Sequence, residues 1–345
     1  MEGFILHDYH TIYLNKMKHI VYIIIALSIL LSGCFEEDER IIPIPINEIE
    51  IPNSMYEYQT YFNISNQSVV ATHHYSDWDL GFESGENGFH IILNYARYMY
   101  AGNTYRTDFQ NIKSNVASTM AFDASSGELD STILNDWADF TDPANPICNE
   151  YVYILDRGKN EQGDEFGIKK IIFEKLEADT FYIHFANLDN TEEYYYKVPK
   201  DTASSFTLFS LDNGGEMVVS EPDKDTWHIC FTKYSTRIPD NDGVLTDYLV
   251  RGVFLNPYKN IEVALDTVNY FDNILPEMIA DYLYSDKRDA IGYDWKVFND
   301  NTYQIRDYNT YILKNVDGLD YKLRFTAFYN EAGEKGYPSF ELTEF

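Results

Sequence analysis

One pattern of residues occurs twice in this chain, about 149 positions apart. In the first copy, Val70 is followed after eight residues by Trp78, which begins the run Trp-Asp-Leu-Gly-Phe. In the second copy, Val219 is followed after the same eight residues by Trp227, which begins Trp-His-Ile-Cys-Phe. Ordered matches at a long period are considered first because they decide the architecture of a chain.

Further matches follow in the same order. Trp137 pairs with Trp295, so all four tryptophans of the chain fall into two pairs. Residues 171–185 correspond, without a gap, to residues 311–325. We interpret the pattern as a tandem duplication; the alternative is a coincidence among strands rich in aromatic residues.

The composition favours strands in both copies. The chain has 345 residues, 45% of them hydrophobic, and its 30 Tyr and 22 Phe suit strands better than helices. Apolar and polar residues alternate as in half-buried strands, with Phe181, Ile183 and Phe185 on one face. We therefore predict a mostly β protein, made of two tandem antiparallel β modules over residues 53–200 and 201–345.

Short helices and one long loop interrupt this pattern. Residues 274–284 have the apolar spacing of a helix, and Pro276 is acceptable in its first turn. Residues 135–140 could form a single helical turn. Residues 142–165, rich in Pro, Asn, Gly and charge, read as an insertion in the first copy, and long loops often carry function.

The net charge of −30 excludes several classes of partner. Nucleic-acid binding depends on Lys and Arg side chains that neutralise phosphates, so no nucleic-acid partner is expected. Attachment to an anionic lipid surface by charge alone is excluded for the same reason.

The N-terminus carries a targeting signal. Two lysines precede residues 20–31, an apolar run of 12 residues that fits a secretory signal and is too short to span a bilayer. The run ends in Leu-Ser-Gly before Cys34, which resembles the lipobox of bacterial lipoproteins. The resemblance implies a signal peptide over residues 1–33, cut before a lipidated Cys34 that anchors the protein. Initiation at Met17 would give a conventional signal peptide; a buried apolar strand ending in Gly-Cys is the alternative.

Residues 34–52 are expected to form a tether. Its first part is acidic, and Pro43 and Pro45 favour an extended spacer over a helix. The acidic cluster at 36–39 resembles the surface-export signal of Bacteroidetes lipoproteins. It favours the outer face of the outer membrane over the periplasm, and a merely solvated tether is the alternative.

The motifs of both copies resemble those of the HmuY family, secreted haem-binding lipoproteins of Bacteroidetes. The similar parts are the run at 78–82, Leu93-Asn94, and a closing segment from Thr310 to Glu341. The resemblance covers a whole family module over 203–345 and is less complete in the first copy. It implies an all-β fold, haem capture, and partnership with a TonB-dependent outer-membrane receptor.

The sequence departs from this family where haem would be bound. The resemblance implies two histidine ligands between the Leu-Asn strand and the closing segment, but residues 257–309 contain no histidine. Phe298 and Asn299 stand where the later ligand is expected. Met278 and His228 are the remaining candidate haem ligands, and structural roles in the core are the favoured alternative for both.

Other chemistry has little support in the sequence. No nucleophile elbow, phosphate loop, dinucleotide fingerprint or zinc-protease motif is present, so no enzyme activity and no metal site is predicted. Cys148 and Cys230 could form one disulfide, but Cys230 lies in an apolar strand pattern typical of a small buried residue. The leading hypothesis is a surface lipoprotein that captures haem or another porphyrin for a transporter; the alternative is a glycan- or protein-binding lipoprotein without haem.

Overall fold

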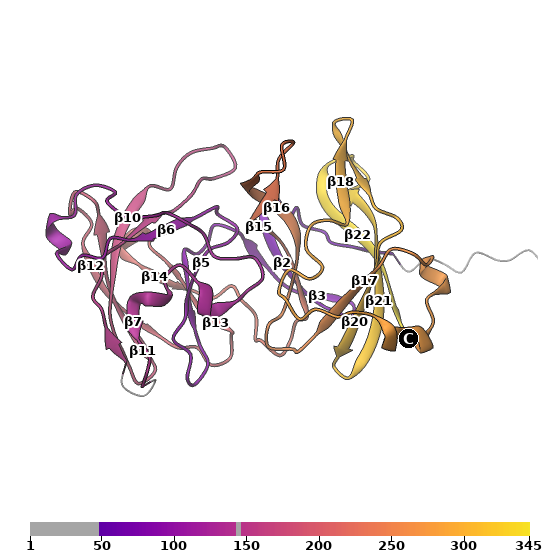
Figure 1. Ribbon diagram of the computed structural model, residues 1–345, viewed down its shortest axis with the longest axis horizontal. Coiled ribbons are helices and arrows are strands. Elements are labelled where there is room, and N and C mark those ends of the chain that lie inside the picture. The colour runs from indigo at the N-terminus through magenta and orange to yellow at the C-terminus, as the bar shows by residue number, and fades with distance from the viewer. Residues whose placement is uncertain (1–47, 143–145) are drawn as a thin grey trace, which may run out of the picture. The chain divides into compact units, whose positions relative to one another are not determined.

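The computed structural model describes residues 48–142 and 146–345. The expected signal peptide, Cys34 and residues 34–47 of the tether lie outside the described residues. The tether prediction is wrong for residues 48–52, because β1 (Glu48–Glu50) pairs with β22 (Lys335–Glu344) and Ile51 is fully buried in the core. Antiparallel strands dominate the described part, and the few helices are short, which confirms the mostly β prediction (Figure 1). Within these two ranges no helix is long and apolar enough to cross a membrane.

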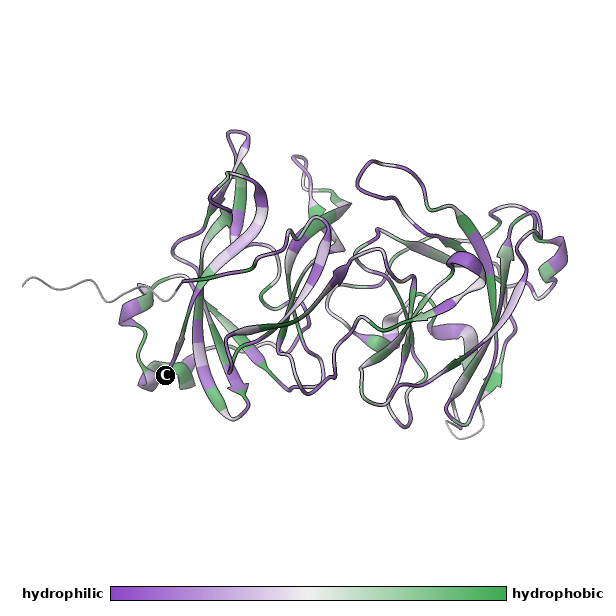
Figure 2. Cartoon of the chain, turned by 180° about the vertical axis from the view of Figure 1, so that it is seen from behind, coloured by the Kyte–Doolittle hydropathy of each residue, from purple (hydrophilic) through white to green (hydrophobic). Residues whose placement is uncertain are grey.

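The predicted alternation of side chains produces the strands as expected. In β11 (Thr180–Asn187), Phe181, Ile183 and Phe185 are almost fully buried on one face. Hydrophobic and hydrophilic residues alternate in this way along the strands, whereas the loops are mainly hydrophilic (Figure 2). Where one face of a strand is buried, this burial fixes the register of the sheet; the strands at residues 91–93 and 206–210 are instead buried on both faces.

The large sheets of the described ranges form two sandwiches, each around its own core. In the first, β12-β11-β10-β9-β6 faces β14-β13-β4-β5. In the second, β1-β22-β21-β20-β17 faces β16-β15-β2-β3. The strands of the first sandwich are β4 (Leu80–Glu83), β5 (Ile91–Leu93), β6 (Tyr100–Asn103), β9 (Tyr153–Asp156), β10 (Ile168–Glu177), β11, β12 (Tyr194–Pro199), β13 (Phe206–Ser210) and β14 (Glu216–Val218). Those of the second are β1 (Glu48–Glu50), β2 (Tyr58–Asn63), β3 (Ser68–His74), β15 (Ile229–Pro239), β16 (Leu245–Leu255), β17 (Glu262–Asp266), β20 (Thr310–Val316), β21 (Leu319–Tyr329) and β22 (Lys335–Glu344).

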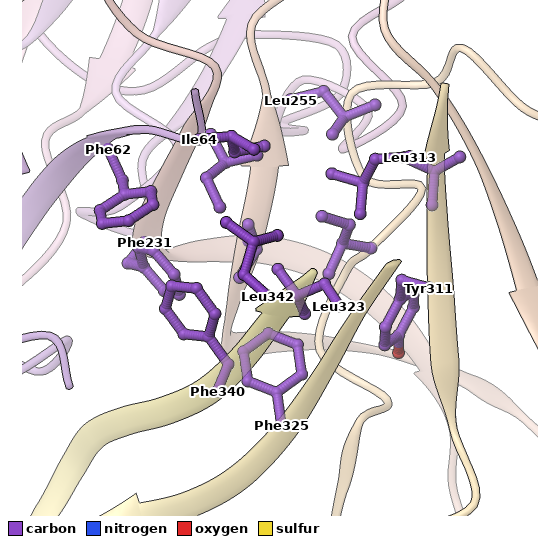
Figure 3. Close-up of a cluster of buried hydrophobic side chains, with 14 of the residues drawn as sticks. Phe62, Ile64, Phe231, Leu255, Tyr311, Leu313, Leu323, Phe325, Phe340 and Leu342 are labelled. Atoms are coloured by element: carbon purple, nitrogen blue, oxygen red, sulfur yellow. The ribbon is translucent and has the colours of Figure 1, made fainter. Parts of the chain in front are cut away.

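The two copies exchange their opening strands. Strands β2 and β3 open the first copy, yet β2 pairs with β15 of the second, with Phe62 opposite Ile229. Strands β13 and β14 open the second copy, yet β13 pairs with β4 of the first. Figure 3 shows the result in the second core, where Phe62 lies against Phe340 of β22, with ring centroids 5.5 Å apart. Each sandwich therefore contains strands from both sides of residue 200, in an intramolecular form of strand swapping.

The chain passes from one sandwich to the other at residues 75–79 and again at residues 219–228, which we call the first and the second crossing. The repeated Leu-Asn motif stabilises both. Asn94 donates through Nδ2 to the carbonyls of Tyr75 and Trp78, at 2.8 and 2.7 Å. Asn256 makes the same pair of bonds, to the carbonyls of Lys224 and Trp227, at 2.7 and 2.9 Å. Trp78 and Trp227, one of the two matched pairs of tryptophans, thus lie at matched crossings, between β3 and β4 and between β14 and β15.

The order of strands in the sheets shows that one predicted match between the two copies, that of residues 171–185 with residues 311–325, is wrong. β9 and β20 occupy the same place in their sheets, and each begins or continues with Tyr-Ile-Leu, at 153–155 and 311–313. The counterpart of residues 311–313 is therefore β9 and not the stretch at 171–173, which belongs to the next strand. Part of the expected insertion is thus a strand common to both copies, and the additional length lies in the loop 157–167.

The short helices are 3-10 turns. η3 (Asn135–Trp137) is the single turn expected near residue 135, and η6 (Pro276–Asp281) lies within the helix expected at 274–284. The others are η1 (Phe109–Asn111), η2 (Leu129–Ser131), η4 (Asp212–Gly214) and η5 (Phe271–Asn273). Two-stranded ribbons are formed by β7 (Ala138–Asp139) with β8 (Ile147–Cys148) and by β18 (Lys296–Asn299) with β19 (Thr302–Ile305).

Candidate functional site

A pocket of about 740 Å³ lies beside two hairpins of the second sandwich, β15–β16 and β18–β19. We call it the hairpin pocket. Its aromatic lining residues come from β16, from the segment before β18, and from β18 and β19: Tyr248, Tyr293, Phe298 and Tyr303. Small-molecule sites are commonly lined by aromatic side chains and a few polar groups, and this lining is of that kind.

Apolar side chains remain exposed on both hairpins beside this pocket. Tyr248 is 50% exposed and Phe298 is 60% exposed, and Leu245 and Val297 are also exposed. Neighbouring exposed apolar residues of this kind are typical of binding surfaces. The rings of Phe298 and Tyr303, 5.0 Å apart, form one aromatic wall.

The pocket is basic although the chain is acidic. Arg251, Lys296 and Arg306 line it against a single carboxylate, that of Asp294, whereas the whole chain has 56 acidic and 26 basic residues. Asp294 forms an ion pair with Arg306, 3.2 Å from Nη2, and neither Arg251 nor Lys296 makes an ion pair within the described residues. Such a reversal of charge indicates an anionic ligand.

Lys296 is held in place by backbone carbonyls. It is only 7% exposed, and its ammonium group donates to the carbonyl of Arg251 at 2.6 Å. Burial, together with the neighbouring Arg251 guanidinium, lowers the pKa of Lys296 well below its usual value. Asp294 opposes this shift, and a further anion beside Lys296 would act in the same direction, so the site favours a ligand that brings negative charge.

Donor groups at the pocket also lack partners. Within the described ranges, the Nε atoms of Arg251 and Arg306 are buried without a hydrogen bond. Nearly all buried polar groups in folded proteins are paired, so unpaired donors beside a cavity point to a ligand or to water.

The two haem-ligand candidates from the sequence lie elsewhere. His228 is fully buried at the second crossing; its Nδ1 accepts from the Ile64 N–H at 2.9 Å, and its Nε2 lies 2.9 Å from Asp317 Oδ2. Asp79 plays the same part at the first crossing, where it accepts from the Leu211 N–H at 2.7 Å. This geometry assigns His228 to the exchange of strands, because both ring nitrogens face protein groups.

Met278 lies in η6, half-buried, where its sulfur accepts from the Leu275 N–H at 3.4 Å. Neither it nor His228 lines the hairpin pocket. Among the described lining residues there is no His, Met or Cys. Cys148 and Cys230 are free thiols, and Cys230 is buried as its strand pattern predicted.

Sequence reasoning did not identify Arg251 and Lys296 as site residues. A signal was present, since both are cations inside apolar strand patterns of a chain with few basic residues. Their proximity could not be predicted from the sequence, because they lie on different hairpins and meet only after the second sandwich has formed.

Comparison with known proteins supports the family resemblance. The HmuY protein family matches residues 178–342, a segment from β11 to β22 that includes the exchanged strands β13 and β14. An apo HmuY analogue from Tannerella forsythia is 15% identical and covers 50% of this chain and 93% of its own, with a TM-score of 0.23. A protein from Bacteroides vulgatus, described as HmuY-like and heme-binding, is 14% identical and covers 50% and 90%, with a TM-score of 0.17. No curated protein matches the chain.

Proposed function

We propose that this chain, whose residues 178–342 belong to the HmuY family, binds a porphyrin in the hairpin pocket. The observation that carries the proposal is the pair of cations without carboxylate partners, Arg251 and Lys296, beside the aromatic wall of Phe298 and Tyr303. A porphyrin such as haem combines a flat apolar ring with two carboxylates. Aromatic side chains suit the ring, and guanidinium and ammonium groups suit the carboxylates.

The residues fit the organic part of haem better than its iron. Haem iron is commonly held by His, Met or Cys, which the described lining lacks, and Tyr is the remaining ligand type. Three tyrosines line the pocket, Tyr248, Tyr293 and Tyr303. Burial, with the carboxylates of Asp294 and Asp289, raises the pKa of Tyr293 and so disfavours the phenolate that would bind iron. The ring and its carboxylates would therefore supply most of the affinity.

The first test compares haem with metal-free protoporphyrin. Because the pocket offers no imidazole or thioether, we expect the two to bind with dissociation constants within about threefold of each other, well under 1.4 kcal/mol. Fluorescence quenching and absorbance titrations would measure both, with the dimethyl ester of protoporphyrin as the control expected to bind at least about tenfold more weakly. Haem binding more than tenfold tighter, with a six-coordinate spectrum, would show that protein ligates the iron. If neither compound bound, the porphyrin proposal would be wrong and a glycan or protein ligand would remain. Affinity gels containing polysaccharides would test for the glycan.

A lipid anchor at Cys34 and an outer-membrane location complete the proposal. The lipobox and the acidic tether support them, and the transporter that would receive the ligand is of the TonB-dependent class that accompanies the HmuY family. A Cys34→Ala variant is expected to lose incorporation of labelled palmitate and to move from the membrane fraction to the soluble fraction, because several acyl chains provide the attachment. Cys148→Ala is the matched control and should stay lipidated. If Cys34→Ala remained in the membrane with its label, the anchor would lie elsewhere.

A further inference from the structure

A second basic cavity, of about 590 Å³, lies where the two copies meet. We call it the junction cleft. Arg97 comes from the first copy after β5, Lys159 and Glu161 come from the loop between β9 and β10, and Lys233 and Arg251 come from β15 and β16 of the second copy. A single module could not form this cleft, because its walls belong to both copies.

The charges in the junction cleft are unbalanced. Four cations, on Arg97, Lys159, Lys233 and Arg251, line it with one carboxylate, that of Glu161. Arg97 and Lys159 pair with carboxylates outside the lining, those of Asp79 and Glu165, at 2.7 and 3.4 Å. Among the described residues this leaves Lys233 with Glu161 alone, at 3.9 Å, and Arg251 without an ion pair. Lys233 and Arg251 are directly opposite each other on paired strands. Like charges in this arrangement destabilise a sheet, so the pair is costly unless an anion lies between or beside them.

Lys233 is buried with little compensation. It is 4% exposed, its ammonium group donates to the Tyr56 carbonyl at 3.0 Å, and the nearest carboxylate oxygen, of Glu161, is 3.9 Å away. Burial lowers the pKa of Lys233 to about 7; Glu161 and Glu57 oppose the shift, and Arg251 increases it. The ammonium also lies 3.1 Å from the centre of the Tyr75 ring.

Two guanidinium groups of the cleft carry donors without partners. Arg97 is 1% exposed; its Nη1 lies 2.7 Å from Asp79 Oδ1 and its Nε donates to the Arg157 carbonyl, but its Nη2 has no partner in the described ranges. The Nε of Arg251 is likewise unpaired. A buried donor without a partner costs free energy that a bound acceptor would recover.

We propose that the junction cleft binds a small oxyanion, a phosphate or carboxylate group, between Lys233, Arg251 and the free Nη2 of Arg97. Guanidinium groups present paired donors that match the oxygens of both anions, and the ammonium adds a point charge. This site does not depend on porphyrin binding, since Lys233 and Arg97 do not line the hairpin pocket. Arg251 lines both cavities, so an anion in the cleft would alter the charge that the hairpin pocket presents.

The experiment is calorimetric titration of the full chain with inorganic phosphate, sulfate and malonate, at an ionic strength held constant with sodium chloride. We expect saturable binding of one anion per chain, and the ratio of phosphate to malonate affinity identifies which group the site prefers. Lys233→Met should weaken binding by at least about tenfold, because a hydrogen bond from a charged donor is lost. Lys159→Met, at an exposed position, should weaken it about threefold with little change in stability, because exposed ion pairs such as Lys159 with Glu165 contribute little. Lys113→Met, an exposed lysine outside the cleft, is the control and should bind like the wild type.

The pH dependence separates a binding role of Lys233 from a structural one. Between pH 7 and 9 sulfate keeps its charge, whereas Lys233 loses its proton. The affinity of the wild type for sulfate should therefore fall as the pH rises from 7 to 9. The same series in Lys233→Met should be flat. Equal responses to sulfate and chloride, or equal affinity in the wild type and Lys233→Met, would overturn the proposal.

Discussion

Cutting the chain between Lys200 and Asp201 is expected to give two fragments that do not fold alone as monomers but reassemble when mixed. The fragment 201–345 lacks β2, so β15 keeps β16 but loses its partner on the other side, and Phe340 loses its contact with Phe62. Burial of Phe62 and Ile64 alone contributes about 1.5–3 kcal/mol for each side chain. Together with a whole ladder of backbone hydrogen bonds, this is comparable to the roughly 5–15 kcal/mol that stabilises a typical domain.

The fragment 48–200 is affected in the same way. It retains β4 and β5 but loses β13, whose Phe209 is fully buried in the first core. Size-exclusion chromatography with light scattering, together with urea unfolding, would measure the outcome. The expected result is one 1:1 complex from the mixture, which unfolds cooperatively, and aggregated or unfolded material from each fragment alone. Two monomers that fold separately and ignore each other would contradict the exchange of strands, and the uncut chain carrying the same cleavage site is the control.

The sequence predicted the type of fold because its signal is local. Alternation along residues 181–185 and turn residues such as Asp317-Gly318 determine strands and hairpins over a few positions. The match of Trp78 with Trp227 also has a local cause, since each stands at a crossing held by an Asn further along the chain, Asn94 or Asn256.

The exchange of strands could not be predicted from the sequence. Because the two opening segments resemble each other, β2 and β13 are each compatible with β4 and with β15, and no residue pattern distinguishes the pairings. The order was decided by the connections at 75–79 and 219–228, which pass from one sandwich to the other. The candidate site could not be predicted for the same reason. The sequence suggested His228 and Met278 as ligands, whereas the cations Arg251 and Lys296 become neighbours only in the folded chain.

Arg251 is the residue whose replacement should affect ligand binding most. It lines both basic cavities, its guanidinium lies 4.1 Å from the centre of the Tyr56 ring, and its Nη1 donates to the Leu249 carbonyl. An Arg251→Met variant keeps much of the aliphatic contact with Tyr56 but removes the charge. We expect porphyrin affinity to fall about 10- to 100-fold, because a charge-assisted contact to a carboxylate contributes about 1.5–3 kcal/mol.

The same variant should be nearly as stable as the wild type or more stable. Arg251 lowers the pKa of both Lys233 and Lys296, so its removal relieves repulsion from two buried ammonium groups. The free energy of unfolding in urea at pH 7 is therefore expected to stay within about 1 kcal/mol of the wild type or to rise. Arg106→Met, at an exposed position of the first copy, is the matched control and should change neither quantity. A variant that kept full porphyrin affinity, or lost it only together with its stability, would show that Arg251 supports the fold and that the ligand contacts other groups.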